Sequence, residues 1–270
     1  MALIYPPQDH KTDSASIFFI GHANSSCLIN GQSIELIKNG NFCPVLALEL
    51  GENSFVIDID GKETKLNITR HKQAQSSSEH KFKDYEGSAY ATSFKRICLD
   101  PGHGGAKLGT VSPKGYAEKD LNLKLCLEIK KELLAKGFEV ILTRESDIDI
   151  SLEDRVRISK EFEADLFLSI HHNAIPDHLD PLEHHGISAH YYYDESLEFA
   201  AKLSAFLAAE LEIEDRGAIK QNLFVTRENL YSQALLVECG YLIHPRESEL
   251  ITKPEFQSKL ASVLATFLTS

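Results

Sequence analysis

Two adjacent histidines end an apolar run in the segment DLFLSIHHNA, residues 165–174. Imidazole binds metal ions and transfers protons near neutral pH, and an ordinary core strand has no need of it. Because successive side chains of a strand point to opposite faces of a sheet, His171 and His172 are expected to have different roles.

Two other apolar runs also lead into residues that could do chemistry. The run ICLD continues into the Gly-rich turn PGHGG, which carries His103, and the run ALLV continues into Glu238. In open α/β sheets the loops beyond the carboxyl ends of the strands form the ligand crevice, so the three runs predict one shared site. An unpaired carboxylate after ALLV would be costly to bury, which favours a functional role for Glu238.

Two histidines and a carboxylate would suit a catalytic zinc ion, which typically takes three protein ligands and leaves a fourth position for water. His103 and His171 are the candidate nitrogen ligands, and the glycines around His103 would leave room for a metal and its substrate. As a hypothesis, Glu118 is the third ligand, although spacing alone allows Asp100 or Asp120 equally.

Other readings of these residues are weaker. The glycines around His103 could cradle a phosphate, but the chain has no G-x-G-x-x-G motif and no P-loop lysine. Four histidines of the later loops are interpreted as solvated: His178, His184, His185 and His190.

Composition limits the class of protein. The chain has 270 residues, 43% of them hydrophobic, which is enough for the core of one large domain or two modest ones. With 28 basic and 40 acidic residues its net charge is -12, which argues against a nucleic-acid partner. No basic amphipathic face is present for anionic lipid, and no apolar stretch is long enough to insert into a membrane. The first residues lack the pattern of an export signal.

The five cysteines do not indicate a disulfide framework or a structural zinc site. They are odd in number, far apart and without a C-x-x-C pair. We therefore expect them to be small buried hydrophobic residues. They are Cys27, Cys43, Cys98, Cys126 and Cys239.

The elements expected to position the site divide the chain in three. Residues 1–72 alternate short β-rich runs with turn signals and predict a small all-β sandwich. Residues 73–94 have few aliphatic side chains and many Ser, Gln and Lys residues, which is typical of a linker. In residues 95–270 strands alternate with helices, as in an α/β layer fold. The expected strands are 96–100, 138–144, 165–171, 186–193, 223–227 and 234–239. The expected helices are about 119–136, one after Ser151, 196–212 and 254–268.

Five segments of residues 95–270 resemble a known family. They are CLDPGHGGAKLGTVSPKGYAEKDLNL, VILTRESDIDISLEDRV, DLFLSIHHNA, DRGAIKQNLFVTRE and ALLVECGYLIHPRE. Their order and spacing are similar to those of the zinc-dependent N-acetylmuramoyl-L-alanine amidases of the amidase-3 family. The resemblance implies a Zn²⁺ ion held by His103, Glu118 and His171, with Glu238 as the acid-base residue. It also implies a mostly parallel six-stranded sheet flanked by helices, in agreement with the strand count.

The reaction implied by the resemblance is hydrolysis of the amide between N-acetylmuramic acid and L-alanine in peptidoglycan. That substrate places the expected location in the periplasm or cell wall, with roles in cell wall degradation and cell separation. Two alternatives are a zinc exopeptidase acting on free wall peptides and a non-catalytic peptidoglycan-binding protein. The presence of both histidines and both glutamates disfavours the second.

This sequence departs from the family pattern in three places. Some relatives carry an inserted helix that blocks the zinc until a protein activator removes it. Here residues 175–236 leave no spare helix, so we expect an open site for which an activator is possible but not required. Relatives often have a glutamate where this chain has Ser188 or Ala189, and Cys239 and Tyr241 also replace residues that are common elsewhere.

The first 72 residues have only a general likeness to the Ig-like sandwiches attached to bacterial wall enzymes. The likeness lies in the NGQ hairpin and the GEN turn. Because the chain contains no Trp, the usual aromatic platform for sugars is poor. A spacer or wall-associating role is therefore favoured for this domain.

Overall fold

The computed structural model describes residues 2–12, 16–36, 40–42, 44–71, 94–175 and 179–269. It separates into two compact units, one centred on residues 2–71 and the other on residues 94–269. The predicted linker, residues 73–94, falls almost entirely outside the described residues. Among the described residues, no helix combines the length and the apolar character needed to cross a membrane.

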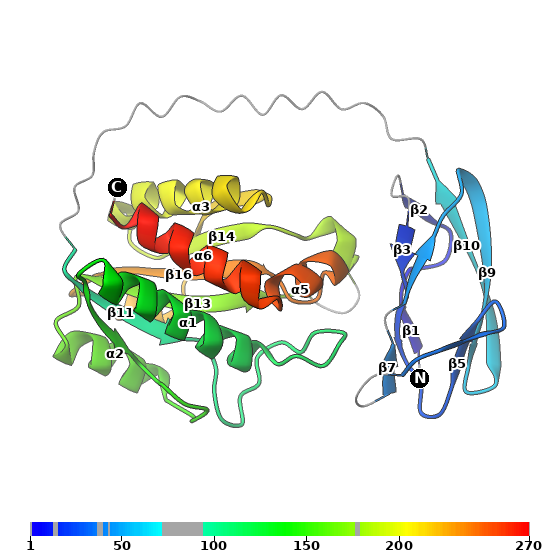
Figure 1. Cartoon of the computed structure of the whole chain (residues 1–270), viewed down its shortest axis with the longest axis horizontal. Coiled ribbons are helices and arrows are strands. Elements are labelled where there is room, and N and C mark those ends of the chain that lie inside the picture. The colour runs from blue at the N-terminus through cyan, green and yellow to red at the C-terminus, as the bar shows by residue number, and fades with distance from the viewer. Residues whose placement is uncertain are drawn as a thin grey trace. The chain divides into compact units, whose positions relative to one another are not determined.

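Strands, most of them short, are the main elements among the described residues of the first unit (Figure 1). They are β1 (Ala2–Tyr5), β2 (His10–Thr12), β3 (Ser16–Phe18), β4 (Ile20–His22), β5 (Cys27–Ile29), β6 (Gln32–Ile34), β7 (Asn41–Phe42), β8 (Val45–Ala47), β9 (Gly51–Ile59) and β10 (Lys62–Arg70). The strands form a five-stranded sheet of order β2-β10-β9-β5-β6, a three-stranded sheet β1-β4-β7 and the pair β3-β8. The predicted small Ig-like sandwich stays a prediction.

Two hairpins of this unit follow from the turn residues. Asn30-Gly31 joins β5 to β6 and Asp60-Gly61 joins β9 to β10, and all four residues have positive φ, as tight two-residue turns require. The Asp60 carboxylate also accepts the backbone N–H groups of residues 24–26, and these bonds hold its pKa well below the usual range. The predicted GEN turn is wrong in detail, because Gly51 already begins β9.

The second unit is a six-stranded sheet flanked by helices, as predicted (Figure 1). Its strands are β11 (Arg96–Pro101), β12 (Glu139–Leu142), β13 (Leu166–Asn173), β14 (Ile187–Tyr191), β15 (Asp215–Lys220) and β16 (Gln233–Tyr241). The order is β12-β11-β13-β16-β14-β15, and every neighbouring pair is parallel except β14 and β16. The helices are α1 (Glu118–Ala135), α2 (Leu152–Glu161), α3 (Leu197–Leu211), α4 (Phe224–Arg227), α5 (Pro245–Ile251) and α6 (Pro254–Phe267), with 3-10 turns at Pro181–Glu183 and Asp194–Ser196.

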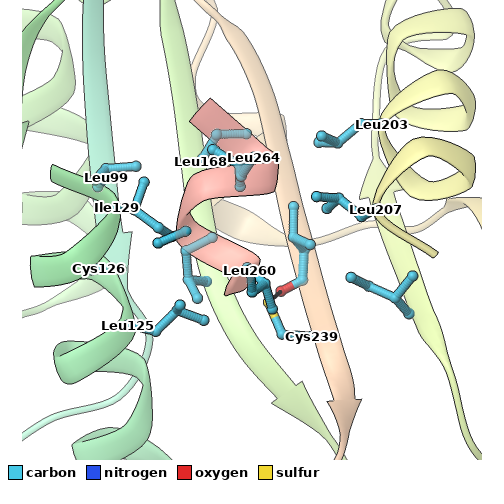
Figure 2. Packing of buried hydrophobic residues seen from close by; sticks show 14 of the residues in the cluster. Leu99, Leu125, Cys126, Ile129, Leu168, Leu203, Leu207, Cys239, Leu260 and Leu264 are labelled. Carbon is cyan, nitrogen blue, oxygen red and sulfur yellow. Dashed lines mark hydrogen bonds between the residues drawn. The ribbon is translucent and has the colours of Figure 1, made fainter. Parts of the chain in front are cut away.

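The two faces of this sheet carry different helices. Figure 2 shows Leu99 of β11, Leu168 of β13 and Cys239 of β16 packed against side chains of α1, α3 and α6. The residues beside them in sequence point the other way, where Cys98 and Phe167 pack against α2 and α4. The alternation of strand side chains therefore determines which face each site residue reaches.

One predicted strand is wrong. Within residues 223–227, Leu223 is the N-cap and Phe224–Arg227 form the single turn of α4. The strand that completes the six-stranded sheet is β15, which comes earlier in the chain and is an edge strand. The predicted helix 119–136 is confirmed as α1, which ends before Gly137 at φ 89°. The predicted cap of α2 is also confirmed, because Ser151 Oγ accepts the backbone N–H of Asp154 at 3.0 Å.

The cysteines agree with their prediction where the structure describes them. Cys27, Cys98, Cys126 and Cys239 are buried and free, and Cys43 lies outside the described residues.

Candidate metal centre

Three side chains from three separate elements converge at one edge of the second unit's sheet. The Nε2 atom of His103 lies 3.1 Å from Oε2 of Glu118, and Nδ1 of His171 lies 3.0 Å from Oε1 of the same carboxylate. One ligand atom from each residue lies within 4.8 Å of the other two. Within the described residues, no other set of three His, Cys, Asp or Glu side chains was found so arranged. The fold thus brings His103, Glu118 and His171 together, and their role as metal ligands stays a prediction.

The glycines near His103 have no side chains, and the imidazole rings fill the space that such side chains would need. His103 itself has φ 61°, and Gly104 and Gly105 continue with φ 131° and 55°, so the chain turns sharply after β11. A Cβ atom on Gly102 would overlap the His171 ring, and one on Gly109 would overlap the Glu118 carboxylate. The packing explains why side chains are absent at these positions.

Glu118 is the first residue of α1 and is 3% exposed. Its Oε2 accepts the backbone N–H of Thr110 at 2.9 Å, and its Oε1 accepts that of His172 at 3.1 Å. Burial raises the pKa of Glu118, but hydrogen bonds from His103 and His171 outweigh burial and hold the pKa well below the usual range. The carboxylate is therefore ionised, and the positive end of the α1 dipole favours the same state.

The two carboxylates that spacing left open do not join the cluster. Asp120 is exposed on α1. Asp100 is buried and accepts hydrogen bonds from Thr143, Arg155 and Ser169, at 2.5, 2.6 and 2.6 Å. Glu118 is thus the carboxylate that the fold brings to the two imidazoles.

Glu238 lies beside this cluster on the neighbouring strand. In the parallel pairing of β13 with β16, Glu238 is the register partner of His171, so both project from the same face of the sheet. Burial raises the pKa of Glu238 to about 7, against the opposing influence of His171. Its Oε2 atom is buried without a hydrogen-bond partner. A carboxyl group with a pKa near neutrality is suited to accept and return a proton.

His172 points away from His171, as predicted, and lies against α1. Its Nδ1 is 2.8 Å from Oδ1 of Asn122, and burial lowers the pKa of His172 to about 4, so the ring is neutral and Nδ1 donates. The Asn122 amide then donates from Nδ2 to Glu118 Oε1 and to the carbonyl of Gly102, both at 3.3 Å. Sequence reasoning missed Asn122, whose signal is its position one helical turn after Glu118.

The solvated interpretation is wrong for His190. This residue lies on β14 and is 8% exposed, with Nδ1 2.6 Å from Oε1 of Gln221 and Nε2 3.1 Å from Oγ of Ser188. Ser188 is itself the register partner of Glu238 in the antiparallel pairing of β14 with β16. His184 and His185 are partly exposed, and His178 lies outside the described residues.

The chemistry of the cluster indicates a class of protein. Two imidazoles and an ionised carboxylate form a donor set that zinc prefers, and a fourth group with a pKa near neutrality stands beside them. Such a site, at the carboxyl ends of strands in a mostly parallel sheet, has the parts of a metal-assisted hydrolase.

The family model Amidase_3, N-acetylmuramoyl-L-alanine amidase, matches residues 97–270. The chain belongs to this family of hydrolases.

Curated relatives are similar over the same region. The germination-specific N-acetylmuramoyl-L-alanine amidase of Bacillus subtilis (strain 168) is 35% identical over 184 residues, which are 62% of this chain and 76% of that protein. The probable cell wall amidase LytH of Staphylococcus epidermidis (strain ATCC 12228 / FDA PCI 1200) is 34% identical over 159 residues, 58% of this chain and 51% of that protein. The chain thus matches about three quarters of the first relative and about half of the second.

Solved structures share the fold of the second unit. The amidase AmiC2 of Nostoc punctiforme covers 65% of this chain and 95% of its own, with TM-score 0.61 and 28% identity. An N-acetylmuramoyl-L-alanine amidase of Clostridium difficile 630 covers 64% and 93%, with TM-score 0.60 and 33% identity. The CwlD amidase of Clostridioides difficile, solved in complex with the GerS lipoprotein, covers 63% and 94%, with TM-score 0.56 and 27% identity.

Proposed function

We propose that this protein is a zinc-dependent amidase that hydrolyses the bond between N-acetylmuramic acid and L-alanine in peptidoglycan. The observation that carries the proposal is the convergence of His103, Glu118 and His171 beside Glu238 in the fold of an amidase family. We propose the cell wall as its place of action, in line with the relatives that are named cell wall amidases.

In the proposed site, His103 Nε2, His171 Nδ1 and the Glu118 carboxylate would hold the metal. These atoms already face one another, and the unpartnered Glu238 Oε2 supports the presence of a further polar group next to them. A bound zinc ion would supply a Lewis acid that activates water and polarises the scissile carbonyl.

The proton transfers are assigned to Glu238. Its Oε2 accepts a proton from the attacking water as the new carbon–oxygen bond forms at the lactyl carbonyl. The same oxygen returns the proton to the alanine nitrogen as the carbon–nitrogen bond breaks. One residue can serve in both steps, because burial raises the pKa of Glu238 in the metal-free chain toward neutrality, where both protonation states are accessible.

We further propose that the site is open without an activator. Between His171 and Glu238, the only described helix longer than one turn is α3, and its Leu203 and Leu207 pack on the sheet face opposite to Glu238. The purified protein should then act without a second protein. A requirement for an added partner protein would contradict this part of the proposal.

The activity is tested with intact sacculi and with free stem peptide. Release of peptides that begin with L-alanine from sacculi, detected by mass spectrometry, supports the amidase. Loss of a terminal amino acid from free peptide would instead support the zinc exopeptidase.

Glu238→Ala should retain zinc but lose turnover by roughly 10² to 10⁴, as expected for a general base. Full activity of that variant would exclude the mechanism.

The ligand assignment is tested with the adjacent histidines as a matched pair. His171→Ala should bind zinc weakly, because it loses a direct ligand. His172→Ala should keep nearly normal zinc binding, because His172 reaches the metal site only through Asn122 and its own backbone N–H. Stoichiometric zinc in His171→Ala would show that the wrong imidazole has been assigned.

A further inference from the structure

Three successive backbone carbonyls around His103 point at two buried arginines. The carbonyl of Pro101 accepts from Arg144 Nε at 3.0 Å and from Arg155 Nη1 at 2.8 Å. The carbonyl of Gly102 accepts from Arg144 Nη2 at 2.9 Å, and that of His103 accepts from Arg155 Nη2 at 2.6 Å. The peptide units on both sides of His103 are thus held by cationic donors.

Arg144 also reaches the element that carries the carboxylate of the cluster. Its Nη2 donates to the carbonyl of Lys119 at 2.8 Å, and Lys119 directly follows Glu118 in the first turn of α1. A single guanidinium therefore fastens the turn after β11 to the start of α1. Arg144 makes four hydrogen bonds from the spread nitrogens of its planar guanidinium, whereas a Lys ammonium has only three N–H donors, all on one atom.

The backbone that these arginines hold is in an unfavourable conformation. His103 has φ 61°, in the left-handed region that side chains with a Cβ atom avoid, and Gly104 and Gly105 also have positive φ. Such a conformation persists only when the surroundings determine it, and hydrogen bonds from charged donors are among the strongest available.

The arginines are not placed to bind a substrate anion. Arg144 is 2% exposed and Arg155 is 3% exposed. The hydrogen bonds of Arg144 all go to backbone carbonyls, the fourth being that of Ser146 at 3.2 Å. Arg155 has one carboxylate partner, the buried Asp100 at 2.6 Å. Their donors are directed into the protein.

We propose that Arg144 and Arg155 are positioning residues that set His103 against Glu118 and so prepare the metal site before metal binds. The inference rests on the proposed function for its zinc readout, but the backbone order that it requires is a property of the metal-free chain. Neither arginine touches the reacting atoms.

The test compares Arg144→Lys and Arg155→Lys with two controls in the full chain. Arg157 lies on α2, the helix that also carries Arg155, and the Arg157 side chain is 55% exposed. Arg157→Lys is therefore the first control. Thr143→Val removes the 2.5 Å hydrogen bond to Asp100 without touching the three carbonyls. Zinc affinity is measured by chelator competition, the metal geometry from the absorption spectrum of the cobalt(II) form, and the order of residues 102–109 by amide hydrogen exchange without metal.

Both positioning variants should bind zinc roughly 10- to 100-fold more weakly, the range typical of residues that support metal ligands. Their cobalt spectra should change, and exchange at residues 102–109 should accelerate. Arg157→Lys should match the wild type in every readout. Thr143→Val should melt at a lower temperature with unchanged zinc affinity.

Unchanged zinc affinity and unchanged exchange in Arg144→Lys and Arg155→Lys would overturn the proposal. If neither variant folded, the proposal would also be overturned, because the two arginines would then be needed for the stability of the whole unit and not specifically for positioning His103. If the wild type itself bound no zinc, the proposed function would fail, while the exchange measured without metal would still decide whether the arginines order the turn.

Discussion

At the scale of single residues, the raised pKa of Glu238 affects both the proposed proton transfers and the stability of the folded chain. Because burial raises its pKa to about 7 in the folded chain, folding favours the protonated form. The protonated Glu238 carboxyl therefore contributes to the stability of the folded chain. This stability is fully present below the unfolded pKa of about 4.5 and is lost as the pH rises through about 7. Each tenfold difference in proton affinity between the folded and unfolded chain is worth about 1.4 kcal/mol, so the stability lost at high pH is roughly 3 to 4 kcal/mol.

Glu238→Gln is therefore expected to stabilise the metal-free protein at pH 8 and to leave its stability nearly unchanged at pH 4.5. The reason is that the amide remains neutral, whereas the buried carboxyl must ionise at the higher pH. Urea unfolding of both proteins at the two pH values measures the difference. Glu210→Gln, at an exposed position of α3, is the control. Equal stability of Glu238→Gln and wild type at pH 8 would contradict the prediction.

The sequence revealed those site residues that end apolar strands. His103, His171 and Glu238 stand out because polar groups at such positions have no role in a core. Glu118 could not be separated from Asp100 and Asp120, because its selection depends on how α1 approaches the sheet. Asn122, Arg144 and Arg155 were missed, since a polar side chain on a helix or after a strand reads as exposed until its tertiary partners are known.

At the scale of elements, the connection between β11 and α1 has no room for a Cβ atom at Gly102 or Gly109. Gly109→Ala should weaken zinc binding, because φ is 67° there and the added Cβ would lie 2.6 Å from His103 Cδ2. Gly217→Ala is a matched control, with φ 73° and no heavy atom within 4 Å of the added Cβ. In both variants the free energy of unfolding should fall by roughly 1 kcal/mol, because alanine resists the left-handed backbone conformation.

Zinc titration and thermal melting separate the two effects. Gly109→Ala should show lower metal affinity together with a lower melting temperature, and Gly217→Ala only the lower melting temperature. The same metal affinity in both variants would show that the space around the cluster is not limiting.

The elements themselves were predictable where burial leaves a strong pattern. Helix α1 has apolar residues at helical spacing, and the strands that carry His171 and Glu238 are continuous apolar runs. Each was found near its expected bounds. Residues 223–227 were misread because Phe224, Val225 and Thr226 have strand preferences, although they form one helical turn. Strand β15 escaped notice because an edge strand with exposed ends needs few apolar residues.

At the scale of the whole molecule, the four site residues and the arginines around them all come from the second unit. That unit has its own core, formed by the sheet with α1, α3 and α6 (Figure 2). A fragment of residues 94–270 should therefore unfold cooperatively and bind zinc with the affinity of the full chain. Circular dichroism during thermal melting and zinc titration check this. A fragment without a cooperative transition would show that the predicted boundary at residues 73–94 is misplaced.

The direction of one strand has a consequence for the surroundings of the site. In the parallel strands β11, β13 and β16 the connection that follows the strand reaches the site. β14 and its parallel neighbour β15 run opposite to them, so the connection that precedes β14 arrives at the site. The stretch that joins β13 to β14 therefore leaves the sheet and returns to it on the same side, because β13 ends there and β14 begins there. Such a stretch can lengthen without altering any strand, and each doubling of a loop adds only about 0.6 kcal/mol of closure entropy. An insertion at this position should therefore change the surroundings of the site while the stability of the sheet stays nearly the same.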